Sequence, residues 1–576
     1  MFRQNERHLQ QPLFSALDGL PEKHQARLAA SWAGVFYREF FCRLDERPFA
    51  RLYSDEASRP NIPVNVLVGL EALKAGFGWS DAEMYDAFSF DVQVRYALGY
   101  RNLGEGDFEL RTMYNFRQRL MERLVKTGEN LLDQAFVQIT DEQIRSFQLK
   151  THQLRMDSTQ IASNIRQMSR LQLLVEVLQR VHRMLNEPDQ ARYSEQFAPY
   201  VQGSPGQYVY HLRGTGTGSH LQAIGELMHR LLAEFALTYV DDPVYQMLQR
   251  VFQEQFSLAE GTVQAIPGSE IRPNRLCSPD DPDATYCRKG SAEYEGYVTN
   301  VTETCTPENP FQLIVKVQTA PNTTSDSKLL VEAIAGLKER TGVATLYNDA
   351  TFCSRAADQA LHEHGVTQVP TGLRGQKPHP HKLHLADFQI QLTSDGQPTE
   401  ITCPQGQTVT VQNGRSPKNY RVHFAVDVCQ ACPLQARCPT YVIKQDQRCA
   451  LYFTWYHIQS AQRRQRYGAY QQSETNPRAA IEATIGGLKH PFSDDQLPVR
   501  GRFRVATLML GSAIMFNVRR IQRHLQGWYG RSVGEETTPD VSLSSNTPCS
   551  WTRLRASIRA LLSFHRLSQP TPTLAS

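Results

Sequence analysis

The sequence has 576 residues, of which 40% are hydrophobic, and a formal net charge of +4 at pH 7. This length accommodates several domains, and the hydrophobic content is ordinary for a soluble globular chain. The opening stretch MFRQNERHLQQPLF has no apolar run before a small-residue cleavage site, and the longest apolar run, residues 505–518, is shorter than the roughly 20 residues of a membrane span. We therefore expect a cytoplasmic protein that has neither a secretory signal nor a membrane partner.

Residues 1–125 are predicted to form a helical N-terminal domain. Apolar residues recur at helical spacing through IPVNVLVGLEALKAGF, and Ser80 or Asp81 is placed to cap the helix that follows GFGWSD. Two helices joined by a short turn are compatible with a DNA-binding helix-turn-helix and equally with a plain packing unit.

The middle of the chain predicts a mixed α/β sheet that is interrupted by a helical insertion. THQLRMDSTQIAS favours a strand that ends at Asp157, and residues 165–257 then show helical periodicity. Strand patterns return in EGYVTNVTET and FQLIVKVQTA, followed by a helix and by a strand that ends at Asp349. Residues 150–164 and 258–375 are therefore assigned to one sheet domain.

The remainder of the chain divides into three parts. Residues 376–455 alternate and are rich in glycine, which predicts a small β-rich insertion, and residues 456–527 return to helices. Residues 528–576 are predicted to form a partly disordered basic tail. From Leu497 to Arg566 there are eleven arginines and no lysine, a pattern that suits phosphate contacts or a solvated helix face.

Three acidic residues are candidates for catalysis. Asp157 and Asp349 follow strands, and Glu482 lies in NPRAAIEATIGGLKH, where Asn476 and Pro477 predict a helix start. At about 100° per residue, Arg478, Glu482 and Lys489 share one face of that helix. Carboxylates from separate elements can hold two Mg²⁺ ions for phosphodiester chemistry. Taken singly, each acid is equally compatible with a turn, a cap or a surface ion pair.

The combination of these motifs resembles the insertion-sequence transposases of the DDE type. RMDSTQIASN is similar to the first-acid motif of that family, LYNDATFCSRAADQALHEHGV to the second, and RAAIEATIGGLKH to the Arg-x3-Glu-x6-Lys signature. The segment VRGRFRVATLMLGSAIMFNVRRI resembles the helix that follows the signature, and the resemblance extends from about residue 10 to 525.

This resemblance implies a ribonuclease-H-like mixed sheet flanked by helices, and an enzyme that cleaves and transfers DNA strands. Asp157, Asp349 and Glu482 would be the catalytic acids and would hold two Mg²⁺ ions, for which Mn²⁺ can substitute. The partners implied are double-stranded transposon ends and target DNA, and pairing of two ends implies a homo-oligomer. The DNA-binding residues expected are Arg478, Lys489, Arg500 and Arg502.

The chain departs from the family pattern in two places. Thr475 stands where the family often has a tyrosine, and the aromatic residue expected after the glutamate is absent from EATIGG, where Gly486 and Gly487 are expected to weaken the helix. Two alternatives therefore stay open: a catalytically inactive, transposase-derived DNA-binding protein, and a metal-dependent nuclease without strand transfer.

Four cysteines of the β-rich insertion form a second candidate metal site. Cys403 lies in TCPQGQ, and Cys429, Cys432 and Cys438 lie in CQACPLQARCP. Four thiolates can hold structural Zn²⁺, and similar transposases carry this Cys pattern, whereas the alternative is a group of reduced surface thiols. His379, His381 and His384 are a rival ligand set, or belong to an exposed loop close to DNA.

Overall fold

The structure is a computed structural model, and it describes residues 1–10, 15–54, 56, 60–212, 216–373, 379, 381–393, 395–443, 448–472, 476–492 and 496–527. Thr475 and the predicted basic tail at 528–576 lie outside the described residues. The residues from Met1 to Gln526 form one compact unit.

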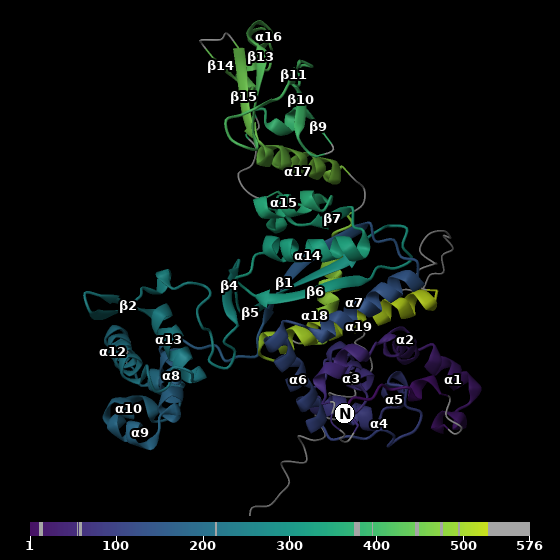
Figure 1. The fold of residues 1–576 in the computed structure, drawn as a ribbon, viewed down its shortest axis with the longest axis vertical. Helices are drawn as coiled ribbons and strands as arrows, with labels where there is room; N and C mark the ends of the chain where they lie inside the picture. The colour runs from purple at the N-terminus through teal and green to yellow at the C-terminus, as the bar shows by residue number, and fades with distance from the viewer. Residues whose placement is uncertain are drawn as a thin grey trace, which may run out of the picture. The chain divides into compact units, whose positions relative to one another are not determined.

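A six-stranded mixed sheet forms the centre of the fold (Figure 1). Its strands are β1 (Gln153–Ala162), β4 (Thr285–Lys289), β5 (Ala292–Thr304), β6 (Ile314–Pro321), β7 (Thr345–Asn348) and β8 (Thr367–Pro370). The long strand β5 pairs antiparallel with β1 on one side and with β6 and β4 on the other, and β1, β7 and β8 are parallel. The order β6-β5-β1-β7-β8 is that of a ribonuclease-H-like fold, so the predicted fold class is confirmed.

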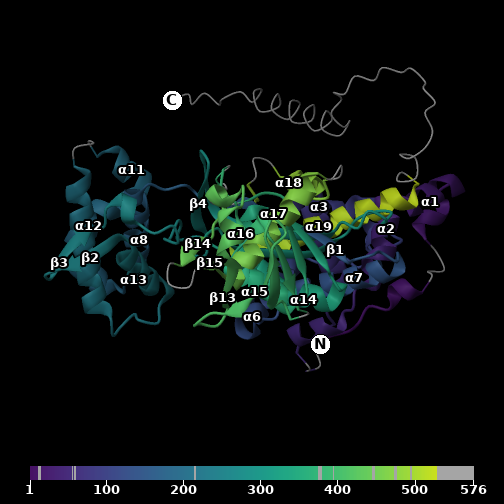
Figure 2. The same cartoon turned by 90° about the horizontal axis from the view of Figure 1, so that it is seen from above.

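Helices cover both faces of this sheet (Figures 1 and 2). Alternate residues of a strand point to opposite faces. Leu154 and Met156 of β1 accordingly pack with α14 (Asp326–Thr341) and α15 (Arg355–Glu363). Ile161 packs with α18 (Ala479–Lys489) and α19 (Arg502–Leu525) on the opposite face. Asp157 has the same parity as Ile161 and therefore faces α18.

Seven N-terminal helices share a hydrophobic core with the α19 side of the sheet. They are α1 (Glu22–Ala29), α2 (Trp32–Glu39), α3 (Val64–Phe77), α4 (Asp81–Phe90), α5 (Val92–Ala97), α6 (Arg111–Thr127) and α7 (Leu131–Ser146). The side chain of Ser80 caps α4. Helix α3 packs closely on α19 where Gly76 and Gly511 have no side chain. A Cβ on Gly76 would lie 2.2 Å from Met515, and one on Gly511 would lie 2.7 Å from Ala75.

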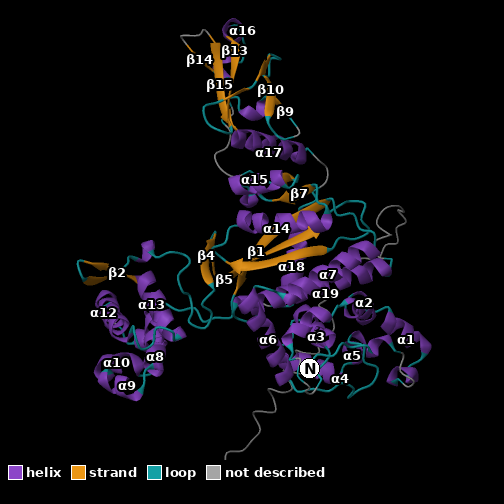
Figure 3. Ribbon diagram, viewed as in Figure 1, coloured by secondary structure: helices purple, strands orange, loops and turns teal. Residues whose placement is uncertain are grey.

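The predicted insertion between β1 and the rest of the sheet forms a group of helices (Figure 3). It has a hydrophobic core of its own. It contains α8 (Arg170–Met184), α9 (Glu187–Arg192), α10 (Ser194–Val201), α11 (Pro205–Tyr210), α12 (Thr217–Phe235) and α13 (Pro243–Gln255). A hairpin, β2 (Phe256–Ala259) and β3 (Thr262–Ala265), follows α13 directly and packs on α12. The insertion is therefore not purely helical, because the apolar residues of the hairpin complete its core.

The Cys-containing segment forms two small sheets and a long helix. One sheet has the order β11-β10-β9 and the other β12-β13-β15-β14. The elements are β9 (Gln389–Leu392), β10 (Pro398–Thr402), β11 (Thr408–Thr410), β12 (Gln412–Asn413), β13 (Asn419–Ala425), α16 (Val426–Gln430), β14 (Tyr441–Ile443), β15 (Arg448–Thr454) and α17 (Trp455–Gln471).

The longest apolar run of the sequence lies inside α19, which is buried against α3 and β6. Across the described ranges, no helix combines the length and the apolar character that crossing a bilayer requires.

Candidate active site

Asp157 lies in the middle of β1. The strand continues for five residues beyond it, to Ala162, and pairs with β5 as far as Gly296. The prediction that the strand ends at Asp157 is wrong, because pairing with the long strand β5 overrides the polar residues that follow the aspartate. The Asp157 residue is 8% exposed, and its carboxylate faces α18.

Asp349 follows β7 directly, as the sequence predicts. Its carboxylate accepts a hydrogen bond from the backbone N–H of Thr351 at 2.6 Å and a second from the Thr351 hydroxyl, and so caps a short 3₁₀ turn. In the parallel register of β1 and β7, Arg155 pairs with Tyr347. This is the last paired position of the two strands, and Asp157 and Asp349 each follow it by two residues in the sequence.

The electrostatics of Asp157 reflect both its burial and this neighbour. Burial raises the pKa of the Asp157 carboxyl, and the Arg478 guanidinium opposes that shift. The negative charge of Asp349 raises the pKa of the Asp157 carboxyl further. A pair of carboxylates with this mutual repulsion favours a cation between them.

Glu482 reaches this pair through Arg478. The guanidinium of Arg478 contacts Asp157 Oδ2 at 2.9 Å through Nη2 and Glu482 Oε1 at 3.3 Å through Nη1. On the same helix face, Lys489 Nζ donates to Thr159 Oγ1 on β1 at 3.1 Å. The structure therefore brings together the three residues predicted to share a face, and places them along β1.

The start of α18 differs slightly from the prediction. The helix begins at Ala479, two residues after Pro477, and Arg478 is its N-cap without a side-chain capping bond. Asn476 still satisfies one free amide, because its Oδ1 accepts from the backbone N–H of Ala479 at 3.1 Å.

The two glycines of α18, which are expected to weaken it, do not interrupt the helix. The helix continues through both to Lys489. A Cβ on Gly487 would lie 2.3 Å from the Phe516 ring of α19, whereas nothing lies within 4 Å of a Cβ on Gly486. Gly487 therefore permits the close packing of α18 on α19.

The donor set fits a hard divalent cation, but the acids are not grouped as ready ligands. Among the residues that the structure describes, no three His, Cys, Asp or Glu side chains lie together closely enough to hold a metal ion. Asp349 is close enough to Asp157 for its charge to act on it. The Glu482 side chain is 64% exposed, and the Arg478 guanidinium lies between it and Asp157. Carboxylate oxygens are nevertheless the ligands that Mg²⁺ prefers, and Asp157, Asp349 and Glu482 supply them from three separate elements.

The other two arginines expected to bind DNA lie outside this group and have protein partners. Arg500 pairs with Asp280 at 3.3 Å, and Arg502 Nε donates to the Thr319 carbonyl at 3.2 Å. Both residues are exposed in part, which leaves donors available to solvent.

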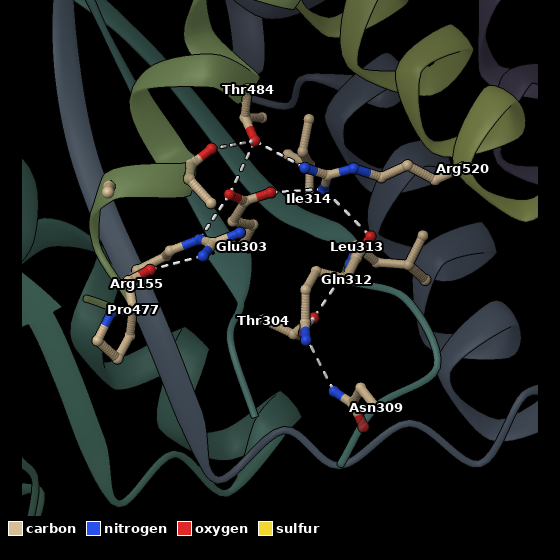
Figure 4. Close-up of polar contacts among 12 residues, drawn as sticks. Arg155, Glu303, Thr304, Asn309, Gln312, Leu313, Ile314, Pro477, Thr484 and Arg520 are labelled. Atoms are coloured by element: carbon tan, nitrogen blue, oxygen red, sulfur yellow. Dashed lines mark hydrogen bonds and ion pairs between the residues drawn. The ribbon is translucent and has the colours of Figure 1, made fainter. Parts of the chain in front are cut away.

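Sequence reasoning missed a buried ionic cluster beside the acids, formed by Arg155, Glu303, Thr484 and Arg520 (Figure 4). The available signal was a charged residue in each of two strands that otherwise read as buried, LRMDS and VTETC. A buried charge requires a partner, so each of these positions predicts an ion pair.

The four predicted zinc ligands line one cavity of about 310 Å³ in the Cys-containing segment. Burial raises the pKa of the Cys429 thiol to about 12, and neighbouring Cys449, Cys438 and Cys403 raise it as well. Cys449, a buried residue of β15, was not among the predicted ligands. The thiols are thus gathered, although they are not arranged as a ready ligand set within the described segments.

The predicted rival ligands are not gathered in this way. The backbone N–H of His381 donates to His379 Nδ1 at 3.2 Å, and both residues are exposed. His384 begins a 3₁₀ turn, in which its backbone N–H donates to Asp387.

One comparison with known proteins found a match. A family model described as "Transposase DDE domain" matches residues 402–522, a range that includes Glu482, Arg478 and Lys489 and begins after Asp157 and Asp349. No curated protein and no solved structure matches the chain. The family match at residues 402–522, together with the ribonuclease-H-like sheet, supports a transposase of the DDE type.

Proposed function

We propose that this chain binds the terminal inverted repeats of its own insertion sequence and catalyses Mg²⁺-dependent DNA cleavage and strand transfer. The observation that carries the proposal is the contact of Arg478 with both Asp157 and Glu482, while Asp349 is close enough for its charge to act on the Asp157 carboxyl. Asp157 of β1, Asp349 after β7 and Glu482 of α18 would supply the three acids, beside the basic side chains of Arg478 and Lys489.

In this proposal, Asp157, Asp349 and Glu482 hold two Mg²⁺ ions, with Mn²⁺ as a substitute. When bound, these ions would lower the pKa of the attacking water and stabilise the charge that develops on the phosphate. Arg478 and Lys489 hold the phosphate beside the acids, and Arg500 and Arg502 contact the flanking backbone. Attack of water on phosphorus releases a 3′-OH, which then attacks a phosphate of the target DNA.

The partners are double-stranded transposon ends and target DNA. The N-terminal helices are proposed to bind the ends, because they present basic residues and share the α19 core with the sheet. Pairing of two ends requires two sites, so we propose that a homo-oligomer acts.

The test is cleavage of the genomic DNA that flanks the coding sequence. Asp157→Asn, Asp349→Asn and Glu482→Gln each remove a charge at nearly constant shape. Each is expected to lower Mg²⁺-dependent cleavage at least about a hundredfold while end binding persists, because metal-held charge stabilisation is lost. Glu332→Gln, on the exposed side of α14, is the matched control and should cleave normally. Full cleavage by Glu482→Gln would contradict the assignment.

One observation favours a second candidate, a non-catalytic DNA-binding protein. The exposed Glu482 side chain stands apart from the aspartate pair and is engaged by Arg478. That candidate predicts salt-sensitive binding to the flanking DNA without Mg²⁺-dependent cutting. A nuclease without strand transfer would cut but yield no joined products, so sequencing of the products separates all three cases.

A further inference from the structure

Glu303 is a fully buried carboxylate that three donors surround. It lies next to the last residue of β5, and its side chain is 0% exposed. Arg155 Nε donates to it at 2.7 Å, Thr484 Oγ1 at 2.9 Å, and Arg520 Nη1 to the second oxygen (Figure 4). The buried charge is therefore fully compensated, as its burial requires.

This cluster attaches α18 to the sheet at two points. Arg155 Nη1 donates to the carbonyl of Pro477 at 2.6 Å, directly before Arg478. Thr484, two residues after Glu482, accepts from Arg520 Nη2 at 2.7 Å while it donates to Glu303. The two attachment points, Pro477 and Thr484 (Figure 4), lie on either side of Arg478 and Glu482 in the sequence.

The same cluster is fixed relative to Asp157. Arg155 and Asp157 are two residues apart on β1 and point to the same face. Glu303 lies directly opposite Arg155 in the antiparallel register of β1 and β5. Arg478 contacts Asp157 directly. The Glu303 cluster instead contacts the backbone carbonyl of Pro477 and the buried side chain of Thr484.

We propose that Glu303, through Arg155 and Thr484, is a positioning residue that sets the distance between Glu482 on α18 and Asp157 on β1. This inference rests on the function proposed above. A well-packed apolar group could fill the same space at similar stability, whereas directional bonds to two guanidinium groups fix one register of the helix on the strand. A displacement of about 1 Å at the acids would be sufficient to weaken metal binding.

Thr484→Val tests the proposal because it removes the hydroxyl bonds at nearly constant volume and leaves Glu303 paired with both arginines. Thr140→Val is the matched control: Thr140 is equally buried in helix α7, and its hydroxyl donates to the Phe136 carbonyl one turn earlier. Thr484→Ser keeps the hydroxyl and serves as the rescue. Arg155→Lys is the second variant, because one ammonium cannot reach both Glu303 and the Pro477 carbonyl as the guanidinium does.

Two measurements on the full-length protein report the result. The first is Mn²⁺ binding, followed by electron paramagnetic resonance, and the second is hydrogen exchange of the amides in residues 479–489. In Thr484→Val we expect the Mn²⁺ dissociation constant to rise, and exchange in α18 to accelerate, each about tenfold. Thr484→Ser and Thr140→Val should retain wild-type values. If Thr484→Val does not fold, the same shifts are expected of Arg155→Lys.

Unchanged Mn²⁺ binding and unchanged exchange in a folded Thr484→Val or Arg155→Lys protein would overturn the proposal. Faster exchange without weaker Mn²⁺ binding would also overturn it, since the cluster would then only stabilise the helix. A wild-type protein that binds Mn²⁺ but does not cleave the flanking DNA contradicts the proposed function alone, because the positioning role is read from Mn²⁺ binding.

Discussion

Arg478 contacts Asp157 at 2.9 Å and Glu482 at 3.3 Å, so one guanidinium compensates two of the three proposed catalytic acids. A cation that binds these carboxylates has to replace this contact. Arg478 therefore supplies part of the positive charge that Mg²⁺ is proposed to supply at these carboxylates.

The first prediction concerns this competition. Arg478→Gln leaves Asp157 and Glu482 without their counter-charge, so Mn²⁺ is expected to bind about tenfold more tightly, which corresponds to about 1.4 kcal/mol. DNA cleavage should nevertheless fall, because the proposed phosphate contact is lost. Arg500→Gln removes an equal charge outside the acid group and should bind Mn²⁺ as the wild type does. Weaker Mn²⁺ binding by Arg478→Gln would refute the competition.

The second prediction contrasts the two neighbouring glycines of α18. Gly487→Ala would place a Cβ 2.3 Å from Phe516 and is expected to destabilise the packing of α18 by about 1–3 kcal/mol. Gly486→Ala points into open space and should stabilise the helix by up to about 1 kcal/mol. Hydrogen exchange of residues 479–489 measures both effects, and equal effects of the two substitutions would contradict the contact.

The third prediction concerns the cysteine cavity. If Cys403, Cys429, Cys432 and Cys438 hold structural zinc, the purified protein will contain one Zn²⁺ per chain, and Cys432→Ser will contain none. Elemental analysis by mass spectrometry gives the stoichiometry. Cys42 is exposed and lies far from these four cysteines in the sequence, so Cys42→Ser is the control.

Cys449 decides which thiols are the ligands. Cys449→Ser should retain zinc if the predicted four are correct, whereas loss of zinc would show that Cys449 replaces one of them. Wild-type protein without zinc would leave reduced thiols as the interpretation.

The fourth prediction follows from Asp81, which accepts hydrogen bonds from Lys74 and Arg117 at 2.6 and 2.7 Å. Burial alone would raise the pKa of Asp81, but these cations lower it to about 2 from the ordinary 3.8. Because the folded-state pKa is depressed, the stabilisation is complete above pH 4 and is lost as the pH falls toward 2, and amounts to about 2 kcal/mol at neutral pH.

Asp81→Asn should therefore accelerate hydrogen exchange in α3 and α4 at pH 7, and the difference from wild type should shrink at pH 3. Asp45→Asn breaks a surface pair with Arg47, whose side chain is 76% exposed, and should cost less than about 1 kcal/mol. A difference for Asp81→Asn that is the same at both pH values would show that its charge is not responsible.

Short sequence patterns were sufficient to predict the turn at Asp349 and the presence of helix α18. The strand before Asp349 ends at a turn that Asp349 itself caps, as predicted, and helix α18 is present with its start at Ala479, shifted slightly from the prediction. The face shared by Arg478, Glu482 and Lys489 follows from helical periodicity alone.

Long-range pairing decided what the sequence could not predict. Asp157 remains inside a strand because β5 pairs with β1 as far as Ala162. Glu303 is compensated by Arg520, which lies 217 positions away in the chain. The role of Gly487 depends on Phe516, a residue of another helix, so neither the glycine nor its neighbour reveals it alone.

The close packing of α3 on α19 limits which N-terminal helices can be joined to the rest of this chain. Gly76 of α3 lies against Met515 of α19, and Gly511 of α19 lies against Ala75 of α3. Helix α19 also packs against β6. A chimaera that takes its N-terminal helices from a distant relative would inherit only one half of this contact. Substitutions on the outer surfaces of the N-terminal helices are therefore expected to be tolerated, whereas exchange of the whole helical part would disturb the shared core.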